Sequence, residues 1–247
     1  MKKLYFIVPV FVVLMAFAIV ARADFKNDIL KTSQGDLEIT FLGHGSLMFG
    51  FKDKIIHVDP FGHVADYSKL PKADLILVTH HHRDHLDPKA LESVRTSKTI
   101  VVITEDCTEQ VKGGIIMKNG DVKTIGGLRV EAIPAYNLVH MHSEGVPYHP
   151  KGIGNGYVIT FGDKRVYVAG DTENTPEMKA LQNIDCAFLP MNLPYTMTPK
   201  MVADAAKTFK PGVLYPYHYD FGETDTAKLV KLMQETSEID TRIWKTK

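Results

Sequence analysis

The sequence has few cysteines and no excess of charge of either sign. Its 247 residues include only Cys107 and Cys186, which excludes a disulfide-dense small domain and a cysteine-rich zinc module. Lys and Arg together number 29, as do Asp and Glu, so no basic field predicts nucleic acid as a partner. Neither a Walker loop nor a G-x-S-x-G motif is present, which argues against P-loop nucleotide binding and against a Ser-His-Asp hydrolase.

Long apolar runs are also scarce, and the one in this sequence lies at the N-terminus. Two lysines precede an apolar stretch over residues 4–20, and Ala21-Arg22-Ala23 follows it. A basic start, an apolar segment and small residues in this order predict a secretory signal peptide over residues 1–23. The alternative is an uncleaved membrane anchor, although the run is short for one and Pro9 interrupts it.

Cleavage of this segment would leave residues 24–247 as one exported domain, in the periplasm or outside the cell. If the segment stays attached, it anchors the same domain to the membrane. Export implies an oxidising compartment, which permits a disulfide between Cys107 and Cys186. The surroundings of Cys186 in "IDCAFL" instead favour a small buried side chain with a free thiol.

The rest of the chain alternates strand-like runs with helix signals and contains no linker. Asp-Pro or Thr-Pro pairs at residues 87–88, 175–176 and 198–199 offer an N-cap followed by proline at the first helical position, and residues 226–235 predict a fourth helix. Gly162-Asp163 predicts a tight hairpin. Together these signals indicate one α/β domain whose sheets are covered by helices. The expected strands are residues 37–42, 46–51, 54–58, 75–78, 99–103, 128–133, 156–161, 165–169, 186–189 and 212–215.

Four of the 11 histidines lie within six positions of "THHHRDHLD", residues 79–87. The cluster follows the apolar run "LILV", which predicts a buried strand whose C-terminal end opens into a loop where α/β proteins usually form their sites. Imidazole and carboxylate are common zinc ligands. In a tight loop, His80 and His82 can face one way, with Asp84 and His85 on the next bend. The spacing H-x-H-x-D-H therefore predicts two metal ions side by side.

Six residues cannot complete two coordination shells, so further ligands must come from elsewhere. The segment "AYNLVHMHSEGVPYHPKGIG" offers His140, His142 and His149. Asp171 in "VYVAGDTENTP" and His218 in "LYPYHYD" each follow an expected strand. Beside the histidine-rich loop, these two positions become candidate ligands.

These segments resemble the metallo-β-lactamase superfamily. "THHHRDHLD" carries the motif T-H-x-H-x-D-H, "VYVAGDT" resembles the strand that delivers a bridging aspartate, and "IIHVDPF" and "YPYHYD" resemble two further site segments. The similarity runs from Leu37 to His218. "FLGHGS", "PAYN", "YHPKGIGNGYVI" and "MNLPYTMTP" resemble the branch with ascorbate-6-phosphate lactonase, N-acylphosphatidylethanolamine-hydrolysing phospholipase D and many predicted metal-dependent hydrolases. This resemblance implies a four-layer αβ/βα sandwich, with metal ions at the edge where two sheets open.

The resemblance also implies the ligands of two divalent metal ions, with Zn²⁺ expected and Mn²⁺ or Fe²⁺ as alternatives. His149 is preferred over His140 and His142 because it lies 22 residues before Asp171, near the usual gap of the family. One ion would be bound by His80, His82 and His149, the other by Asp84, His85 and His218, with Asp171 bridging the two.

Residues around these ligands receive expected roles on the same basis. Asp59 is expected to orient a ligand and not to bind metal. His44 would either reach the substrate side of the site or be a buried, hydrogen-bonded histidine. His81 and Arg83 occupy variable positions of the motif and receive no role. Phosphate recognition would need Arg or Lys near the metal ions, and Lys151 and Lys200 are candidates by position alone.

The predicted reaction is hydrolysis of an ester, lactone or phosphodiester bond in a small molecule. Two adjacent dications lower the pKa of a bridging water, so hydroxide is available near neutral pH. Asp84 and Asp171 would position this nucleophile, and either would move a proton to the leaving group. β-Lactam hydrolysis is not expected, because true zinc β-lactamases lack a bridging aspartate at the place of Asp171.

Two other classes of protein compete with the hydrolase prediction. One is an iron-loaded redox protein on the same scaffold, although such relatives typically have Glu at the position of His82. The other is a non-catalytic metal-binding protein. The sequence predicts neither the individual substrate nor the oligomeric state.

Overall fold

The computed structural model describes residues 25–221 and 224–244. The expected signal peptide, residues 1–23, lies outside the described residues. Among the helices within them, none combines the length and the apolar content needed to cross a bilayer.

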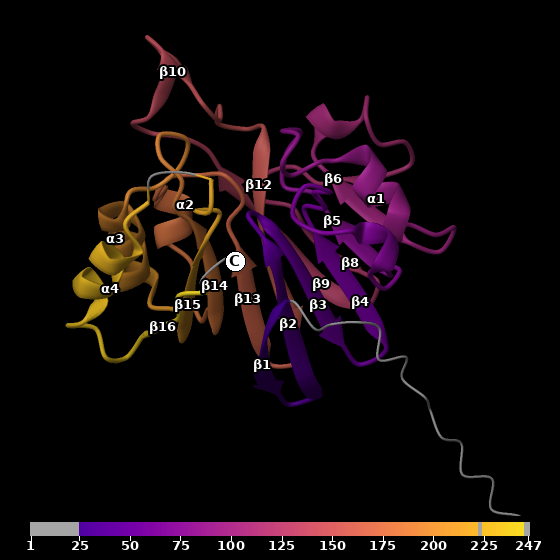
Figure 1. Ribbon diagram of the computed structural model, residues 1–247, viewed down its shortest axis with the longest axis horizontal. Coiled ribbons are helices and arrows are strands. Elements are labelled where there is room, and N and C mark those ends of the chain that lie inside the picture. Colours follow the sequence, from indigo (N-terminus) through magenta and orange to yellow (C-terminus); the bar gives the residue numbers. More distant parts are fainter. Residues whose placement is uncertain (1–24, 222–223, 245–247) are drawn as a thin grey trace, which may run out of the picture.

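The first half of the chain forms a seven-stranded sheet in the simple order β1-β2-β3-β4-β5-β6-β7 (Figure 1). The first four strands form an antiparallel meander, and β4 to β7 are parallel. The parallel strands all end at the same edge of the sheet, which is where α/β proteins usually place their sites. The strands are β1 (Lys26–Thr32), β2 (Gly35–Gly43), β3 (Ser46–Phe51), β4 (Lys54–Val58), β5 (Leu75–Leu77), β6 (Ile100–Ile103) and β7 (Ile115–Ile116).

The second half forms another seven-stranded sheet, in the order β16-β15-β14-β13-β12-β9-β8. Strands β8, β9, β12 and β13 are antiparallel, and β13 to β16 are parallel. A separate two-stranded hairpin, β10 (Met141–Ser143) with β11 (Val146–Pro147), projects from the body of the molecule (Figure 1). The strands of the sheet are β8 (Val122–Ile125), β9 (Leu128–Ala135), β12 (Gly154–Phe161), β13 (Lys164–Val168), β14 (Cys186–Pro190), β15 (Val213–Tyr217) and β16 (Asp240–Thr241).

The apolar core between the two sheets follows from the two-residue period of their strands. In β5, Leu75 and Leu77 point into the central core, whereas Ile76 joins a cluster on the outer face. Phe49 of the first sheet meets Phe161 of the second, with ring centroids 5.7 Å apart. The sheets therefore pack face to face, as in a sandwich.

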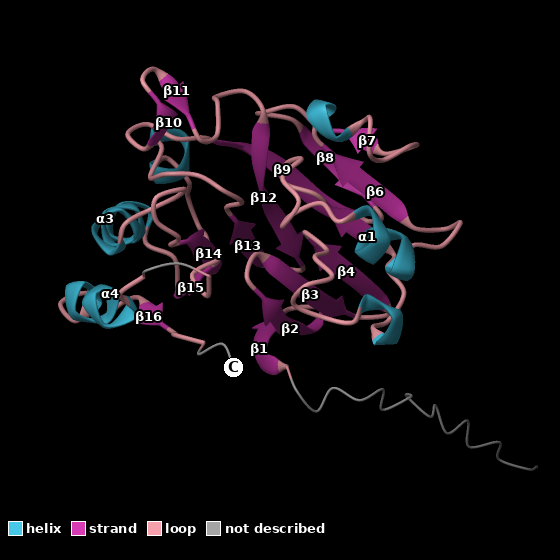
Figure 2. Cartoon of the chain, turned by 45° about the horizontal axis from the view of Figure 1, so that its top comes forward, coloured by secondary structure: helices cyan, strands magenta, loops and turns pink. Residues whose placement is uncertain are grey.

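Helices cover both outer faces, which completes four layers (Figure 2). The residues of α1 (Pro88–Val94) and of the 3₁₀ turn Tyr67–Lys69 pack on the first sheet, and those of α2 (Pro176–Lys179), α3 (Pro199–Phe209) and α4 (Thr226–Met233) pack on the second. A further 3₁₀ turn spans Glu105–Cys107. The predicted single-domain αβ/βα sandwich is confirmed.

Local sequence signals explain how these helices begin. Asp87, Thr175 and Thr198 each accept a hydrogen bond from a backbone N–H of the first helical turn, and a proline follows each of them. The predicted hairpin at Gly162 is also present, with Phe161 paired to Lys164. Gly162 has a φ of 61°, a left-handed conformation that glycine adopts without steric cost.

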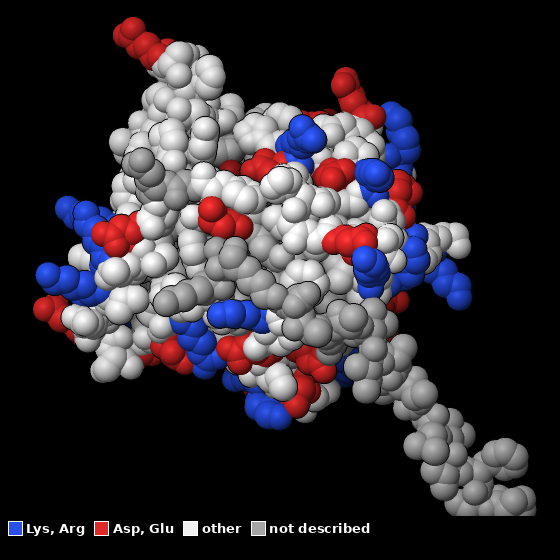
Figure 3. All heavy atoms as spheres, in the orientation of Figure 1, with Lys and Arg blue, Asp and Glu red and all other residues white. Residues whose placement is uncertain are grey.

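Both cysteines are buried free thiols, as the surroundings of Cys186 indicated. On the face seen in Figure 3, acidic and basic side chains are interspersed and neither sign forms a continuous field. The balanced composition therefore corresponds to a mixed distribution of charge on that face.

Candidate metal centre

The predicted ligands converge at the edge of the sandwich from both sheets. The loop Thr79–Asp87 follows β5 of the first sheet, whereas Asp171 and His218 follow β13 and β15 of the second. His149 lies between the β10–β11 hairpin and β12. Five of the seven side chains are almost fully buried: His80, His85, His149, Asp171 and His218.

The first ligand group consists of His80, His82 and His149. Nε2 of His80 lies 3.0 Å from Nδ1 of His82, and Nε2 of His149 lies 3.3 Å from the same atom. Three imidazole nitrogens therefore face one point, which is a donor set that zinc favours.

The second ligand group consists of Asp84, His85 and His218. Nε2 of His85 lies 3.0 Å from Nε2 of His218, and Oδ2 of Asp84 lies 3.4 Å from Nε2 of His218. This group offers two imidazoles and one carboxylate to a second point.

Asp171 lies between the two groups and turns one oxygen toward each. Its Oδ2 lies 3.3 Å from Nε2 of His149, and its Oδ1 lies 3.2 Å from Nε2 of His85 and 3.3 Å from Nε2 of His218. Oδ1 is buried and has no donor in hydrogen-bond geometry among the described residues, although the imidazole nitrogens of His85 and His218 lie within ion-pair distance. A buried carboxylate oxygen without a donor is costly unless a cation satisfies it.

The spacing of the donor atoms fits tetrahedral metal ions. With metal–ligand distances of about 2.0–2.2 Å, a tetrahedral ion keeps its donors about 3.3–3.6 Å apart. The distances quoted above for the two groups and Asp171 run from 3.0 to 3.4 Å, and Oδ2 of Asp84 lies 3.8 Å from Nε2 of His85. The residues present therefore offer donor atoms at spacings that fit divalent metal ions.

The protonation of His80 and His82 suits metal binding. Burial lowers the pKa of His80 well below its ordinary value and that of His82 to about 4, and neighbouring imidazoles add to both shifts. Both rings are therefore neutral and keep a lone pair for a metal. Burial raises the pKa of Asp171, but the imidazoles of His218 and His85 outweigh it, and the pKa lies well below the usual range. Burial opposes the charged form of His85, but the carboxylates of Asp171 and Asp59 raise the pKa of His85 well above its ordinary value, so a metal ion must displace a proton there.

Neighbouring side chains contact Nδ1, the ring nitrogen that faces away from the ligand groups, in three of the ligand imidazoles. Oδ2 of Asp59 lies 2.7 Å from Nδ1 of His85, so the expected orienting role of Asp59 stays a prediction, which this contact supports. The Thr79 hydroxyl lies 3.0 Å from Nδ1 of His80, and the Asn192 amide lies 3.3 Å from Nδ1 of His218. These contacts leave Nε2 of the three rings directed toward the ligand groups.

His44 is a buried, hydrogen-bonded histidine that also contacts the second ligand group. Its Nδ1 lies 2.7 Å from Oδ1 of Asp220, and its Nε2 lies 3.1 Å from Oδ2 of Asp84. The ring also lies over that of His218, with centroids 3.6 Å apart. Burial raises the pKa of Asp84, but the contacts with His218 and His44 bring it far below its usual range, so the carboxylate is ionised.

The alternative candidates lie apart from the ligand groups. His81 contacts Asp106, and His142 lies on the exposed strand β10. Nδ1 of His140 lies 2.5 Å from Glu173, so its ring is engaged elsewhere. The structure therefore brings His149, and neither His140 nor His142, to the first ligand group.

The two lysines considered for phosphate recognition are also placed. Lys151 forms an ion pair with Glu177 at 2.8 Å, and Lys200 is exposed at the start of α3. Neither contact connects a lysine to the ligand groups.

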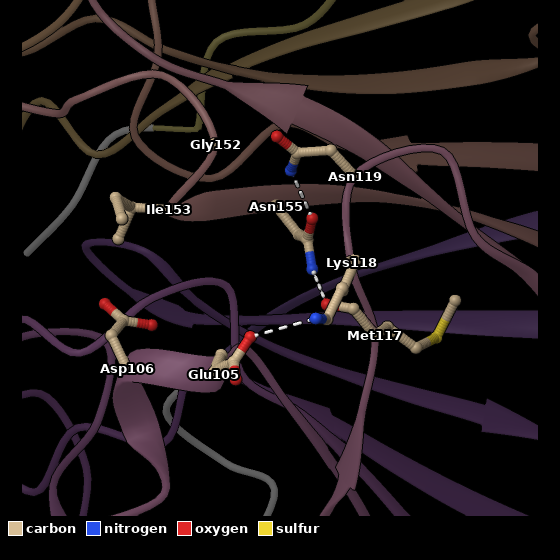
Figure 4. Close-up of a pocket in the computed structure, with 8 residues that line it drawn as sticks. All are labelled: Glu105, Asp106, Met117, Lys118, Asn119, Gly152, Ile153 and Asn155. Atoms are coloured by element: carbon tan, nitrogen blue, oxygen red, sulfur yellow. Dashed lines mark hydrogen bonds and ion pairs between the residues drawn. The ribbon is translucent and has the colours of Figure 1, made fainter.

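A pocket of about 380 Å³, whose lining includes none of the candidate ligands, is formed by residues that contact the histidine-rich loop (Figure 4). Asp106 in its wall contacts His81, and the backbone N–H of Asn155 donates to the carbonyl of Thr79 at 2.9 Å. The volume suits a small molecule or one part of it. The lining residues are Glu105, Asp106, Met117, Lys118, Asn119, Gly152, Ile153 and Asn155.

Comparison with known proteins agrees with this architecture. A family model described as a beta-lactamase superfamily domain matches residues 38–218. A UPF0173 metal-dependent hydrolase of Desulforamulus reducens is 32% identical over 196 residues, which cover 74% of this chain and 85% of that protein. The chain is therefore a member of the beta-lactamase superfamily. Within it, the chain belongs to the UPF0173 metal-dependent hydrolases.

Solved structures give the same result. A Parabacteroides distasonis protein assigned as a metal-dependent hydrolase has a TM-score of 0.84 and 47% identity, over 90% of this chain and 100% of that one. Igni18, a metallo hydrolase from Ignicoccus hospitalis, has a TM-score of 0.70 and 25% identity, over 85% of this chain and 95% of that one. The resemblance to the metallo-β-lactamase superfamily inferred from the motifs is confirmed.

Proposed function

We propose that this metal-dependent hydrolase is exported and cleaves an ester, lactone or phosphodiester bond at a centre of two divalent ions. The observation that carries the proposal is the position of Asp171, whose two oxygens face two different groups of ligands. One carboxylate so placed is suited to bridging two ions.

The ligands of the two ions are assigned from the distances. His80, His82 and His149 would hold one ion, and Asp84, His85 and His218 the other. When bound, the two ions would supply an activated water and polarise the carbonyl or phosphoryl oxygen of the substrate. Zinc is the expected metal because imidazole nitrogen and carboxylate oxygen are its usual ligands, and three imidazoles face the first ion.

The chain's own residues supply positioning and proton transfer. Asp171 is 4% exposed at its side chain, whereas Asp84 is 35% exposed. Asp84 is therefore the carboxylate that a substrate and its leaving group can reach, and it is the better placed of the two to move a proton. Nε2 of the buried His44 lies 3.1 Å from Oδ2 of Asp84, and this contact fixes the orientation of the Asp84 carboxylate.

The main test combines metal analysis with a substrate panel. The purified chain, loaded with zinc or manganese, is assayed on a nitrophenyl ester, a lactone and a nitrophenyl phosphodiester. Two ions per chain with turnover of one class supports the proposal. Two ions with no turnover favours a non-catalytic metal-binding protein. An iron pair with a visible absorption band in the chain as purified, before loading, favours a redox protein.

Export is tested separately on the full chain. The chain is expressed in a bacterium, the cell is fractionated, and the N-terminus of the product is sequenced. A periplasmic product that begins at Asp24 supports a signal peptide over residues 1–23. A product with an intact N-terminus in the membrane fraction indicates an anchor.

A further inference from the structure

Glu173 is a fully buried carboxylate that orders three consecutive backbone amides. Its Oε2 accepts hydrogen bonds from the N–H of Leu138 at 2.6 Å and of Val139 at 2.7 Å. Its Oε1 accepts the N–H of His140 at 2.8 Å and lies 2.5 Å from Nδ1 of the same residue. One side chain thereby fixes the start of the segment that leads into the β10–β11 hairpin.

Asn137, the residue directly before these three amides, holds His149. Its Oδ1 accepts the backbone N–H of His149 at 2.8 Å and the ring Nδ1–H at 2.7 Å. Its own backbone N–H donates to the carbonyl of His149 at 2.9 Å. Its Nδ2 donates to the carbonyl of Tyr195 at 2.9 Å and lies 3.4 Å from Oε1 of Glu173. The orientation of the His149 ring therefore depends on where Asn137 sits.

His149 needs such an anchor more than the other ligands do. It lies in the excursion between β9, which ends at Ala135, and β12, which begins at Gly154. The only regular structure in that excursion is the β10–β11 hairpin, whose strands pair with each other and with neither large sheet. An isolated hairpin is marginally stable in water and cannot hold a ligand by itself.

We propose that Glu173 is a positioning residue for His149, acting through Asn137 and the backbone amides of residues 138–140. The proposal rests on the proposed two-ion centre and adds a selective effect to it. Glu173 supports the ion bound by His80, His82 and His149, because the second ligand group is held by different residues. Asp59 holds His85, and Asn192 lies against His218.

A carboxylate is required at this position because every partner of Glu173 is a donor. An amide at the same place would turn an NH₂ group toward backbone N–H groups, which would leave buried donors unpaired. Glu173→Gln therefore changes the volume of the side chain very little but removes its ability to accept a hydrogen bond from every neighbouring donor. Glu177→Gln is the matched control, since Glu177 lies on the same segment but pairs with Lys151 and Tyr136.

The experiment measures zinc binding to the intact chain by competition with a chelator, and repeats it with cobalt to follow the absorption bands of the two sites. The wild type and Glu177→Gln bind two ions. Glu173→Gln is expected to bind one ion with unchanged affinity and the other about 10- to 100-fold more weakly. Circular dichroism of the metal-free proteins checks that the fold is retained.

Asn137→Ala provides a second, independent variant, because it removes the acceptor for His149 and leaves the contacts of Glu173 with the backbone in place. Asn137→Ala should weaken binding of the same ion as Glu173→Gln. It can be measured even if Glu173→Gln does not fold. If the wild type binds two ions and both variants bind both ions as tightly as the wild type does, the positioning role is wrong and the two-ion centre remains. A wild type that binds no ion would instead remove the proposed function.

Discussion

Oδ2 of Asp59 lies 2.7 Å from Nδ1 of His85, and this contact joins the end of β4 to the histidine-rich loop that follows β5. Both side chains are fully buried. The other oxygen of Asp59 accepts the backbone N–H of Thr79 at 2.8 Å, so a single carboxylate holds the first residue of the loop and one of its ligands.

Asp59→Asn should weaken binding of the ion held by Asp84, His85 and His218 by about 10- to 100-fold, because the amide no longer offers an acceptor to every donor around it. Asparagine tolerates the φ of 48° at this position, so the backbone is kept. Stepwise zinc affinity is the measurement. Asp66→Asn, on the surface, is the control; if the two variants bind zinc alike, Asp59 does not orient the ligand.

His149→Ala should remove one of the two ions and at least most of the hydrolytic activity, since the first ligand group would keep only His80 and His82. His142→Ala is the matched control, because His142 is exposed on β10 in the same segment. Metal content by atomic emission and turnover of the preferred substrate are measured together. Loss of an ion in His142→Ala but not in His149→Ala would contradict the assignment of the third ligand.

Stability should fall with acidification because of His57. Burial lowers the pKa of His57 from 6.5 to about 4. Below about pH 6.5 the unfolded chain binds a proton at His57, whereas the folded chain binds it only near pH 4. The contribution of His57 to the free energy of unfolding is therefore complete above about pH 6.5 and is lost as the pH falls to about 4. The loss amounts to about 3 kcal/mol.

The measurement for His57 is the free energy of unfolding by urea between pH 7 and pH 4. His57→Gln should flatten this profile by about 3 kcal/mol relative to the wild type, since glutamine has no proton to bind in this range. His63→Gln, at an exposed histidine, is the matched control for the substitution itself. Parallel profiles for the wild type and His57→Gln would show that His57 is not the cause.

Phe49→Ala should destabilise the fold by about 3–5 kcal/mol, because it leaves a cavity between the two sheets. The Phe49 ring is fully buried and packs between Phe161 and Phe188 of the opposite sheet. Phe221→Ala is the control, as Phe221 is 55% exposed. Urea unfolding of both variants at one pH gives the comparison, and equal losses would mean that Phe49 does not fill the interior of the sandwich.

The elements that could be predicted from sequence are those that bury a regular pattern of side chains. The strand run at residues 46–51 and the capped helix beginning after Thr198 have such patterns, and both are present at those positions. Strand β1 was missed, because it is an edge strand that is largely exposed and alternates weakly. Strand β7 consists of two exposed isoleucines and carries no periodicity at all.

The candidate ligands could be inferred from residue type and spacing, whereas the residues that hold them could not. Imidazoles two and five positions apart are rare enough to indicate chemistry. Asn137 in "PAYN" and Asn192 in "MNLPYTMTP" lie in segments that resemble the family, but their spacing assigns no role to them. Glu173 follows Asp171 by two residues and looks like any polar loop residue, because its function depends on amides 33 to 35 positions away in the chain.

Each proposed ion would take ligands from both halves of the sandwich, since the loop after β5 supplies part of each set and the second sheet supplies the rest. Metal occupancy would then cross-link the two sheets at their open edge. At a free concentration one hundredfold above the dissociation constant, each ion adds about 2.7 kcal/mol to the free energy of unfolding. The melting temperature of the chain would therefore rise with the concentration of free metal around it. Without metal, the chain would unfold more often and be cleaved more readily by proteases.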